Sequence, residues 1–132
     1  MPWLVKTEPG TYSYDDLERE GRAVWDGVTN PQALNNLKEM AVGERVFIYH
    51  TGDEKSVVGE AEVVRTAYPD PKAGKLVVVD LKAVKRLKSA VTLADLKAES
   101  AFEESPLVRQ GRLSVVPITA AQASLIEKRS GA

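Results

Sequence analysis

The chain has 132 residues, of which 43% are hydrophobic, so it can bury one packed core but is too short for two ordinary domains. It contains no cysteine and a single histidine, His50, which excludes a disulfide framework and a Cys/His zinc site. The formal net charge of -1 argues against a protein that binds phosphate groups over its whole surface, because that mode needs many Lys and Arg side chains.

The N-terminal segment lacks the basic start and the long apolar stretch of a signal peptide, and nowhere do 18 apolar residues run together. We therefore expect a soluble cytoplasmic protein with no membrane partner. For a chain of this length we also expect a single domain over residues 1–132, and a monomer.

The N-terminal part of the chain combines two short strands with a helix between them. Residues 3–7 are the first predicted strand and residues 23–25 the second. Between them, Ser13 and Asp16 have the spacing of a capping box, which predicts a short helix that ends near Gly21.

The strongest helix pattern of the chain follows. Asn30 is placed to cap its N-terminus, with Pro31 at the first helical position, and apolar residues then recur at helical spacing until Gly43 closes the helix. Trp25 precedes this helix. Burial preferences alone favour a core position for its ring, whereas its place before a turn and a helix N-terminus allows it to face a cleft.

The middle of the chain is rich in strand patterns. Residues 45–50 and 57–66 predict two strands joined by a polar loop, and Gly59 is expected to mark a bulge or a bend in the second of them. Residues 68–71 (YPDP) predict a loop by their composition. Residues 76–87 predict a further strand that is long enough to bend across a barrel.

The C-terminal third returns to short elements. Thr92, with Asp95 three residues later, predicts a short helix, residues 113–117 predict the last strand, and Thr119 is expected to cap a closing helix. Strands outnumber helices and no regular strand–helix alternation is present. The pattern therefore predicts an α+β, mainly β fold, in which short helices flank a small, strongly curved sheet or barrel.

The charges are unevenly distributed along the chain. Residues 65–88 hold seven basic side chains against two acids, whereas residues 1–26 hold six acids against three basic side chains. Such polarity can orient an anionic ligand toward one side of a small domain. An ordinary solvated surface accounts for the pattern equally well.

No motif of a known catalytic site is present. The sequence lacks GxxxxGK[ST], GxGxxG and GxSxG, so phosphate-loop, dinucleotide-binding and hydrolase-elbow chemistry have no support. His50 could transfer a proton, but a lone histidine without a visible nucleophile defines no reaction, and a structural role is favoured. We therefore expect no enzymatic activity, no cofactor and no bound metal.

A family resemblance is carried by the blocks WLVKTEP, YSYDDL, WDGVTN followed by A-x-x-x-L-x-x-M, GERVFIYHTG, VVGEAEVV, AYPDP and RLSVVPIT. Together they resemble the EVE domain family, which is related to the PUA, YTH and ASCH domains, and they run in order over residues 3–119. The resemblance implies a PUA-like β-barrel flanked by helices. It also implies a pocket for a flipped-out, often modified nucleobase such as 5-methylcytosine or 5-hydroxymethylcytosine.

Matching the blocks residue by residue assigns the base-binding pocket to Lys6, Thr7, Trp25, Asn30, Tyr49 and His50. For Trp25 the resemblance favours a stacking platform over a core role. The capping role of Asn30 already accounts for that residue without a ligand. Because neighbouring side chains alternate along a strand, only one of Lys6 and Thr7 is expected to line the pocket, unless the strand twists or ends there.

The chain is thus predicted to be a non-enzymatic module that binds DNA or RNA carrying a modified base. Contacts to phosphate are expected from five basic side chains, Lys82, Lys85, Arg86, Arg109 and Arg112. Two alternatives stay open. One is a small enzyme that acts on a nucleoside or nucleotide, with His50 or an acid near Trp25 transferring the proton. The other is a protein-interaction module whose pocket is vestigial.

Overall fold

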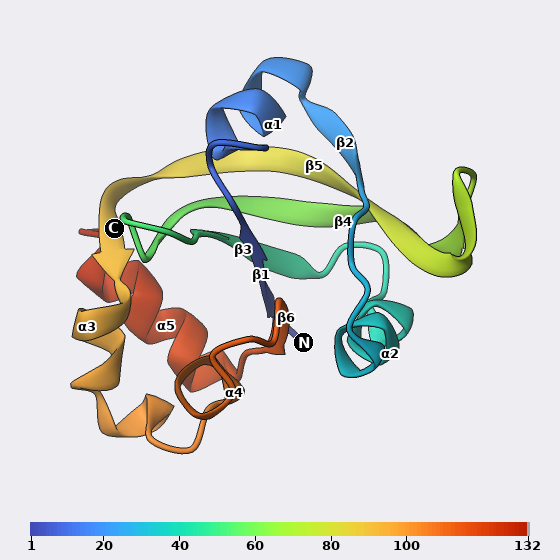
Figure 1. Cartoon of the computed structure of the whole chain (residues 1–132). Helices are drawn as coiled ribbons and strands as arrows, with labels where there is room; N and C mark the ends of the chain where they lie inside the picture. The colour runs from blue at the N-terminus through green and yellow to red at the C-terminus, as the bar shows by residue number, and fades with distance from the viewer. Residues whose placement is uncertain (132) are drawn as a thin grey trace.

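One curved six-stranded sheet organises the computed structural model, which describes residues 1–131 (Figure 1). The strand order is β2-β5-β4-β3-β1-β6. The strands are β1 (Trp3–Thr7), β2 (Arg22–Trp25), β3 (Arg45–His50), β4 (Ser56–Asp70), β5 (Ala73–Thr92) and β6 (Val115–Pro117). β1 pairs with β3 in parallel, and the other neighbours pair antiparallel. This arrangement confirms the predicted α+β, mainly β fold class.

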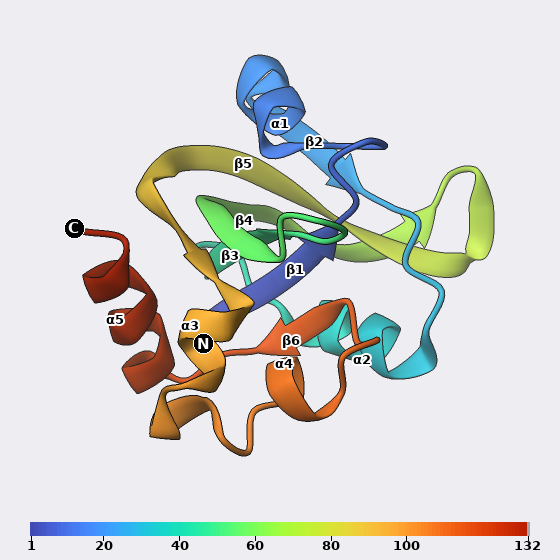
Figure 2. The ribbon, with the colours of Figure 1, turned by 60° about the vertical axis from the view of Figure 1, so that its left-hand side comes forward.

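The curvature is concentrated in the long hairpin of β4 and β5, which are 15 and 20 residues long. Their register shifts at five places, beginning between Val57 and Gly59. Each shift bends the strands and increases their twist. As a result the tip of the hairpin projects beyond the sheet on one side, while β5 curls over toward α3 on the other (Figure 2).

The helices surround the sheet rather than forming a layer of their own. They are α1 (Tyr14–Glu20), α2 (Pro31–Glu39), α3 (Leu93–Lys97), α4 (Pro106–Arg109) and α5 (Ala120–Arg129), with a 3-10 turn over Ser100–Phe102. The predicted caps are confirmed, since the side chains of Ser13, Asn30, Thr92 and Thr119 each accept a hydrogen bond from a backbone N–H in the first turn.

Several predicted boundaries were wrong. β5 runs over Ala73–Thr92, where the sequence predicted a strand over residues 76–87. α2 ends at Glu39, because Met40 already has an extended backbone and Gly43 belongs to the following turn, where its N–H donates to the Val63 carbonyl. Residues 68–70 continue β4 and do not form a loop. Pro69 lies beside a register shift, a position where a strand tolerates a proline. The 3-10 turn and α4 were not predicted.

Tyr14 is the side chain that fastens α1 to the sheet. It is fully buried, and its hydroxyl donates to the Glu60 carbonyl at 2.7 Å. The ring lies directly on the backbone of Gly59, where an added Cβ would be 2.4 Å from the ring. The predicted irregularity at Gly59 is confirmed by the register shift there, and the close contact with Tyr14 gives a second reason for glycine at this position.

We expect Gly59→Ala to lower the free energy of unfolding by ~1–3 kcal/mol, because the new methyl group overlaps the buried Tyr14 ring. Gly74→Ala is the matched control, since a Cβ at that strand position meets no atom within 4 Å. Urea denaturation of both variants checks this. Equal stabilities for the two variants would contradict the role given to Gly59.

Candidate functional site

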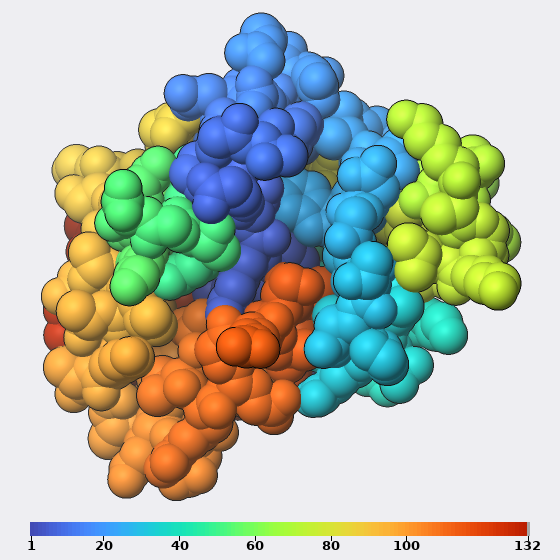
Figure 3. Space-filling view, in the orientation of Figure 1, coloured from blue at the N-terminus to red at the C-terminus, as the bar shows by residue number. Residues whose placement is uncertain are grey.

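A cavity of about 650 Å³ opens where the end of β1, the strand β2 and the tip of the β4–β5 hairpin converge. In the space-filling view a recess lies between the N-terminal residues and the segment that leads into α2 (Figure 3). The volume is within the ~300–1,000 Å³ range typical of small-molecule sites. The polar and aromatic residues that line it are Lys6, Thr7, Thr11, Tyr12, Glu20, Arg22, Trp25, Asp26, Lys72 and Ser114.

Two aromatic side chains form one wall of the cavity. Trp25, the last residue of β2, is only 6% exposed and packs in the hydrophobic core, yet it also lines the cavity. Tyr12 meets it edge to face, with the ring centroids 6.0 Å apart and the planes at 84°. Trp25 therefore belongs both to the core and to the cavity wall. From the sequence alone, these two roles were alternatives.

Tyr12 was not predicted as a site residue, although it is the first residue of the YSYDDL block that carries the family resemblance. Its hydroxyl donates to Glu20 at 2.6 Å, and its carbonyl accepts a hydrogen bond from the Thr7 hydroxyl at 2.6 Å. Burial and the hydrogen bond to Glu20 raise the pKa of Tyr12 well above its usual value. The ring is thus held in place and its hydroxyl stays protonated at neutral pH.

Lys6 and Thr7 both line the cavity, which is the exception expected if the strand ends at this point. The reason is that β1 ends at Thr7, where strict alternation of side chains also ends. Lys6 donates to the Gly111 carbonyl at 2.9 Å and lies 5.6 Å from the centre of the Tyr49 ring. Burial lowers the pKa of Lys6.

Arg22 is the second cation of the cavity, and its orientation is set by Asp80. The Arg22 guanidinium pairs with the buried Asp80 carboxylate at 2.8 Å, and the Tyr68 hydroxyl donates to the same carboxylate. Burial alone would raise the pKa of Asp80, but the hydrogen bonds from Arg22 and Tyr68 outweigh it and lower that pKa. The third cation, Lys72, lies at the turn of the β4–β5 hairpin.

The other predicted pocket residues do not line the cavity. Asn30 caps α2, where its side chain accepts from the Ala33 N–H at 3.0 Å. Tyr49 is buried beneath Lys6 and is 4% exposed. The cavity wall described for residues 1–131 includes neither these two residues nor His50.

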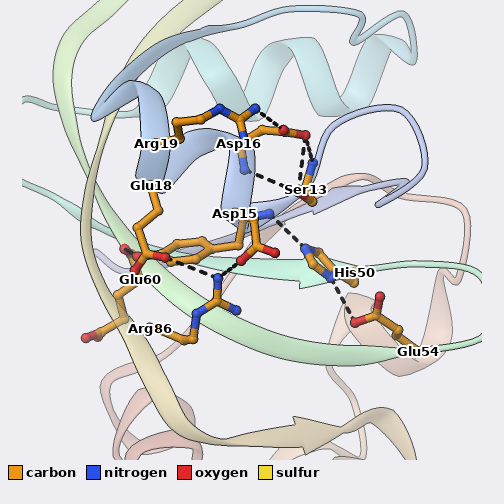
Figure 4. A network of polar contacts seen from close by, with 10 residues as sticks. Ser13, Asp15, Asp16, Glu18, Arg19, His50, Glu54, Glu60 and Arg86 are labelled. Carbon is orange, nitrogen blue, oxygen red and sulfur yellow. Dashed lines mark hydrogen bonds and ion pairs between the residues drawn. The ribbon is translucent and has the colours of Figure 1, made fainter.

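His50 is committed to the attachment of α1 (Figure 4). It is 5% exposed, and its Nε2 accepts a hydrogen bond from the Tyr14 N–H at 3.0 Å. A backbone N–H can only donate, so Nε2 is unprotonated and Nδ1 carries the proton that faces Glu54 at 2.9 Å. The geometry gives His50 the structural role that was favoured from the sequence.

None of the five basic residues predicted to contact phosphate lines the cavity. Arg86 lies over the Tyr14 ring and pairs with Asp15 and Glu18 (Figure 4). Lys85 is 3.6 Å from the buried Glu60 carboxylate and Arg109 is 3.0 Å from Glu104. The remaining two, Lys82 and Arg112, are exposed and form no ion pair within the described part of the chain. The cations at the cavity are Lys6, Arg22 and Lys72 instead.

Residues 1–131 contain neither a candidate metal site nor a membrane-spanning helix. In this range no group of three His, Cys, Asp or Glu side chains could hold a metal ion. The helices of the same range are all too short or too polar to cross a membrane.

We expect His50→Leu to lower the free energy of unfolding by ~1–3 kcal/mol, because the buried Tyr14 N–H loses its acceptor. Glu54→Gln is the control, since the amide oxygen can still accept from Nδ1–H of His50. Thermal and urea denaturation check the difference. A His50→Leu variant as stable as the control would refute the anchoring role.

Asp80→Asn should destabilise the protein at pH 7, and the deficit should shrink as the pH falls. The lowered pKa of Asp80 lies below the unfolded-state value of about 3.9, so its stabilising effect is complete above that value and is lost as pH falls through the folded-state pKa. Urea denaturation of both proteins at pH 7 and at about pH 3 measures this. A deficit independent of pH would contradict it.

Comparisons with known proteins place the chain in a family. The EVE domain model matches residues 2–129. Human thymocyte nuclear protein 1 is 30% identical in an alignment that covers 89% of this chain and 68% of that protein.

Solved structures agree with this match. Rpa0253 from Rhodopseudomonas palustris has a TM-score of 0.92 at 44% identity, over 98% of this chain and 92% of that one. Human THYN1 protein in complex with 5-methylcytosine containing DNA has a TM-score of 0.90 at 27% identity, over 99% of this chain and 98% of that one. An ASCH protein from Zymomonas mobilis shares the fold alone. Its TM-score is 0.62 at 12% identity, and the match covers 96% of each chain. The chain belongs to the EVE domain family.

Proposed function

We propose that the chain is a nucleic-acid-binding module that takes a flipped-out, modified nucleobase of the 5-methylcytosine or 5-hydroxymethylcytosine type into this cavity without catalysing a reaction. The observation that carries the proposal is the open cavity walled by Trp25 and Tyr12 and lined by three cations. The human THYN1 structure adds support, because a protein similar over 99% of this chain was solved with 5-methylcytosine containing DNA.

The energetics make aromatic stacking necessary but not sufficient. Extracting a base from a duplex costs a few kcal/mol, and stacking it on an aromatic ring returns ~1–3 kcal/mol. These two contributions nearly cancel, so net affinity has to come from hydrogen bonds to the base and from contacts to phosphate. A methyl group in an apolar slot adds only ~0.8 kcal/mol, a factor of about four, whereas a hydroxymethyl group can also hydrogen-bond.

Electrostatics restrict phosphate binding to the mouth of the cavity. The formal net charge of -1 offers no general attraction for nucleic acid. Lys6, Arg22 and Lys72 are nevertheless gathered at one site. Lys6 and Arg22 are engaged with the Gly111 carbonyl and Asp80, so Lys72 is the cation that can bind a phosphate next to an inserted base. So few contacts predict weak binding with a shallow salt dependence, because the slope of log K against log salt grows with the number of phosphates that the protein neutralises.

The enzyme alternative has little in the site to support it. Both ring nitrogens of His50 are engaged and the residue lies outside the cavity wall described for residues 1–131. The Tyr12 hydroxyl is also engaged, since it donates to Glu20 at 2.6 Å. Incubation of the protein with a 5-methylcytosine oligonucleotide, followed by nucleoside analysis, should return the base unchanged.

The two tryptophans allow a direct test of stacking. In Trp3→Phe only Trp25 remains, and saturable quenching by an oligonucleotide that carries 5-methylcytosine is expected at low salt. In Trp25→Phe only Trp3 remains, buried away from the cavity, and no quenching is expected. Fluorescence titrations, with circular dichroism as a check on folding, measure both.

A third variant measures affinity. Trp25→Leu should weaken binding roughly 5- to 150-fold in fluorescence anisotropy, the range expected for the loss of one stacked base. Unchanged binding and an unquenched Trp25 would overturn the base-pocket proposal and favour a module whose pocket is vestigial.

A further inference from the structure

Most polar side chains around the cavity are already engaged within the protein. Lys6 donates to the Gly111 carbonyl, and Arg22 pairs with Asp80. The Thr7 hydroxyl donates to the Tyr12 carbonyl, and the Tyr12 hydroxyl donates to Glu20. These contacts shape the wall and leave few charged groups for a ligand.

Two charged side chains of the wall stay uncommitted, and they have opposite signs. Within residues 1–131, neither the carboxylate of Asp26 nor the ammonium of Lys72 forms a hydrogen bond or an ion pair. Asp26 directly follows Trp25, and Lys72 lies at the hairpin turn. A nucleotide has matching features, because its phosphate is an anion and some of its bases carry an amino donor.

We propose that Asp26 reads the base edge by accepting a hydrogen bond from an exocyclic amino group. This inference rests on the proposed function and sharpens it: the cavity takes amino-bearing bases, of the cytosine and adenine type, in preference to thymine and uracil. Lys72 then neutralises the adjoining phosphate.

The chemistry of a carboxylate supports this selectivity. An ionised carboxylate only accepts hydrogen bonds, and carboxylates pair with the amino group of cytosine in known recognition. The O4 atom of thymine or uracil is itself an acceptor, so the two oxygens would repel each other. Hydroxyl groups such as those of Thr11 and Ser114 cannot discriminate in this way, since they both donate and accept.

Asp26 is also the better placed of the two acids in the wall. One carboxylate oxygen of Glu20 is held by the Tyr12 hydroxyl, and Glu20 lies at the end of α1. Asp26 is exposed to solvent, which limits the strength of any single hydrogen bond. The wall holds three cations against these two acids, so a cationic ligand such as a methylated lysine is disfavoured.

The test uses labelled single strands in which every position but the central one is abasic, so that one base alone can enter the cavity. The central base is 5-methylcytosine in the first strand, 5-methylcytosine without its 4-amino group in the second, and thymine in the third. All three bases have the 5-methyl group, so they differ only at position 4 and in the protonation of the ring. Anisotropy titrations at low salt should give Kd values about tenfold higher for the second and third strands than for the first.

Asp26→Asn should bring the three Kd values to within about twofold of one another, because an amide can donate as well as accept. The matched control is Asp53→Asn, which changes the net charge equally at an exposed residue outside the cavity wall of residues 1–131 and should keep the tenfold preference.

Two failures are distinguishable. If 5-methylcytosine binds and quenches Trp25, but the three strands bind alike or Asp26→Asn keeps the preference, the role of Asp26 is overturned while the base pocket stands. If no strand quenches Trp25, the base pocket fails as well. A trimethyl-lysine peptide that binds where the strands do not would replace the nucleobase as the ligand.

Discussion

The attachment of α1 to the sheet through Tyr14 is the constraint on which the cavity depends. The ring lies on the bare backbone of Gly59, the hydroxyl donates to the Glu60 carbonyl, and the N–H donates to His50. Tyr12 precedes this anchor and Glu20 ends the same helix, so the hydrogen bond between them spans α1 from one end to the other. Both residues line the cavity, and their positions follow from how α1 is fastened.

Part of the uneven charge of the sequence is paired within the fold. Arg86, from the basic segment, pairs with Asp15 and Glu18 of the acidic N-terminal segment. Arg22, a base of the N-terminal segment, pairs with Asp80, an acid of the basic segment. These pairs hold α1 and β2 against β5. Some of the charges therefore attach elements to the sheet, and Lys72 is the residue of the basic segment that reaches the cavity.

The length of the β4–β5 hairpin connects the fold with the site. Its register shifts bend both strands, and its turn brings Lys72 to a cavity whose other walls come from β1, β2 and α1. A hairpin that ended before this turn would leave the cavity without Lys72. The irregular pairing of β4 and β5 thus affects the lining of the cavity as well as the curvature of the sheet.

The local elements could be read from the sequence because their signals are local. The capping box of Ser13 and Asp16, the cap at Asn30 with Pro31, and the strand over Arg45–His50 depend on residues only a few positions apart, and all are confirmed. The block resemblance likewise identified the family and placed Lys6, Thr7 and Trp25 at the site. The tertiary structure alone decided the rest, because contacts between distant residues leave no local pattern. It committed His50 to the Tyr14 N–H, buried Tyr49 beneath Lys6, and brought Tyr12, Arg22, Asp26 and Lys72 together around one cavity.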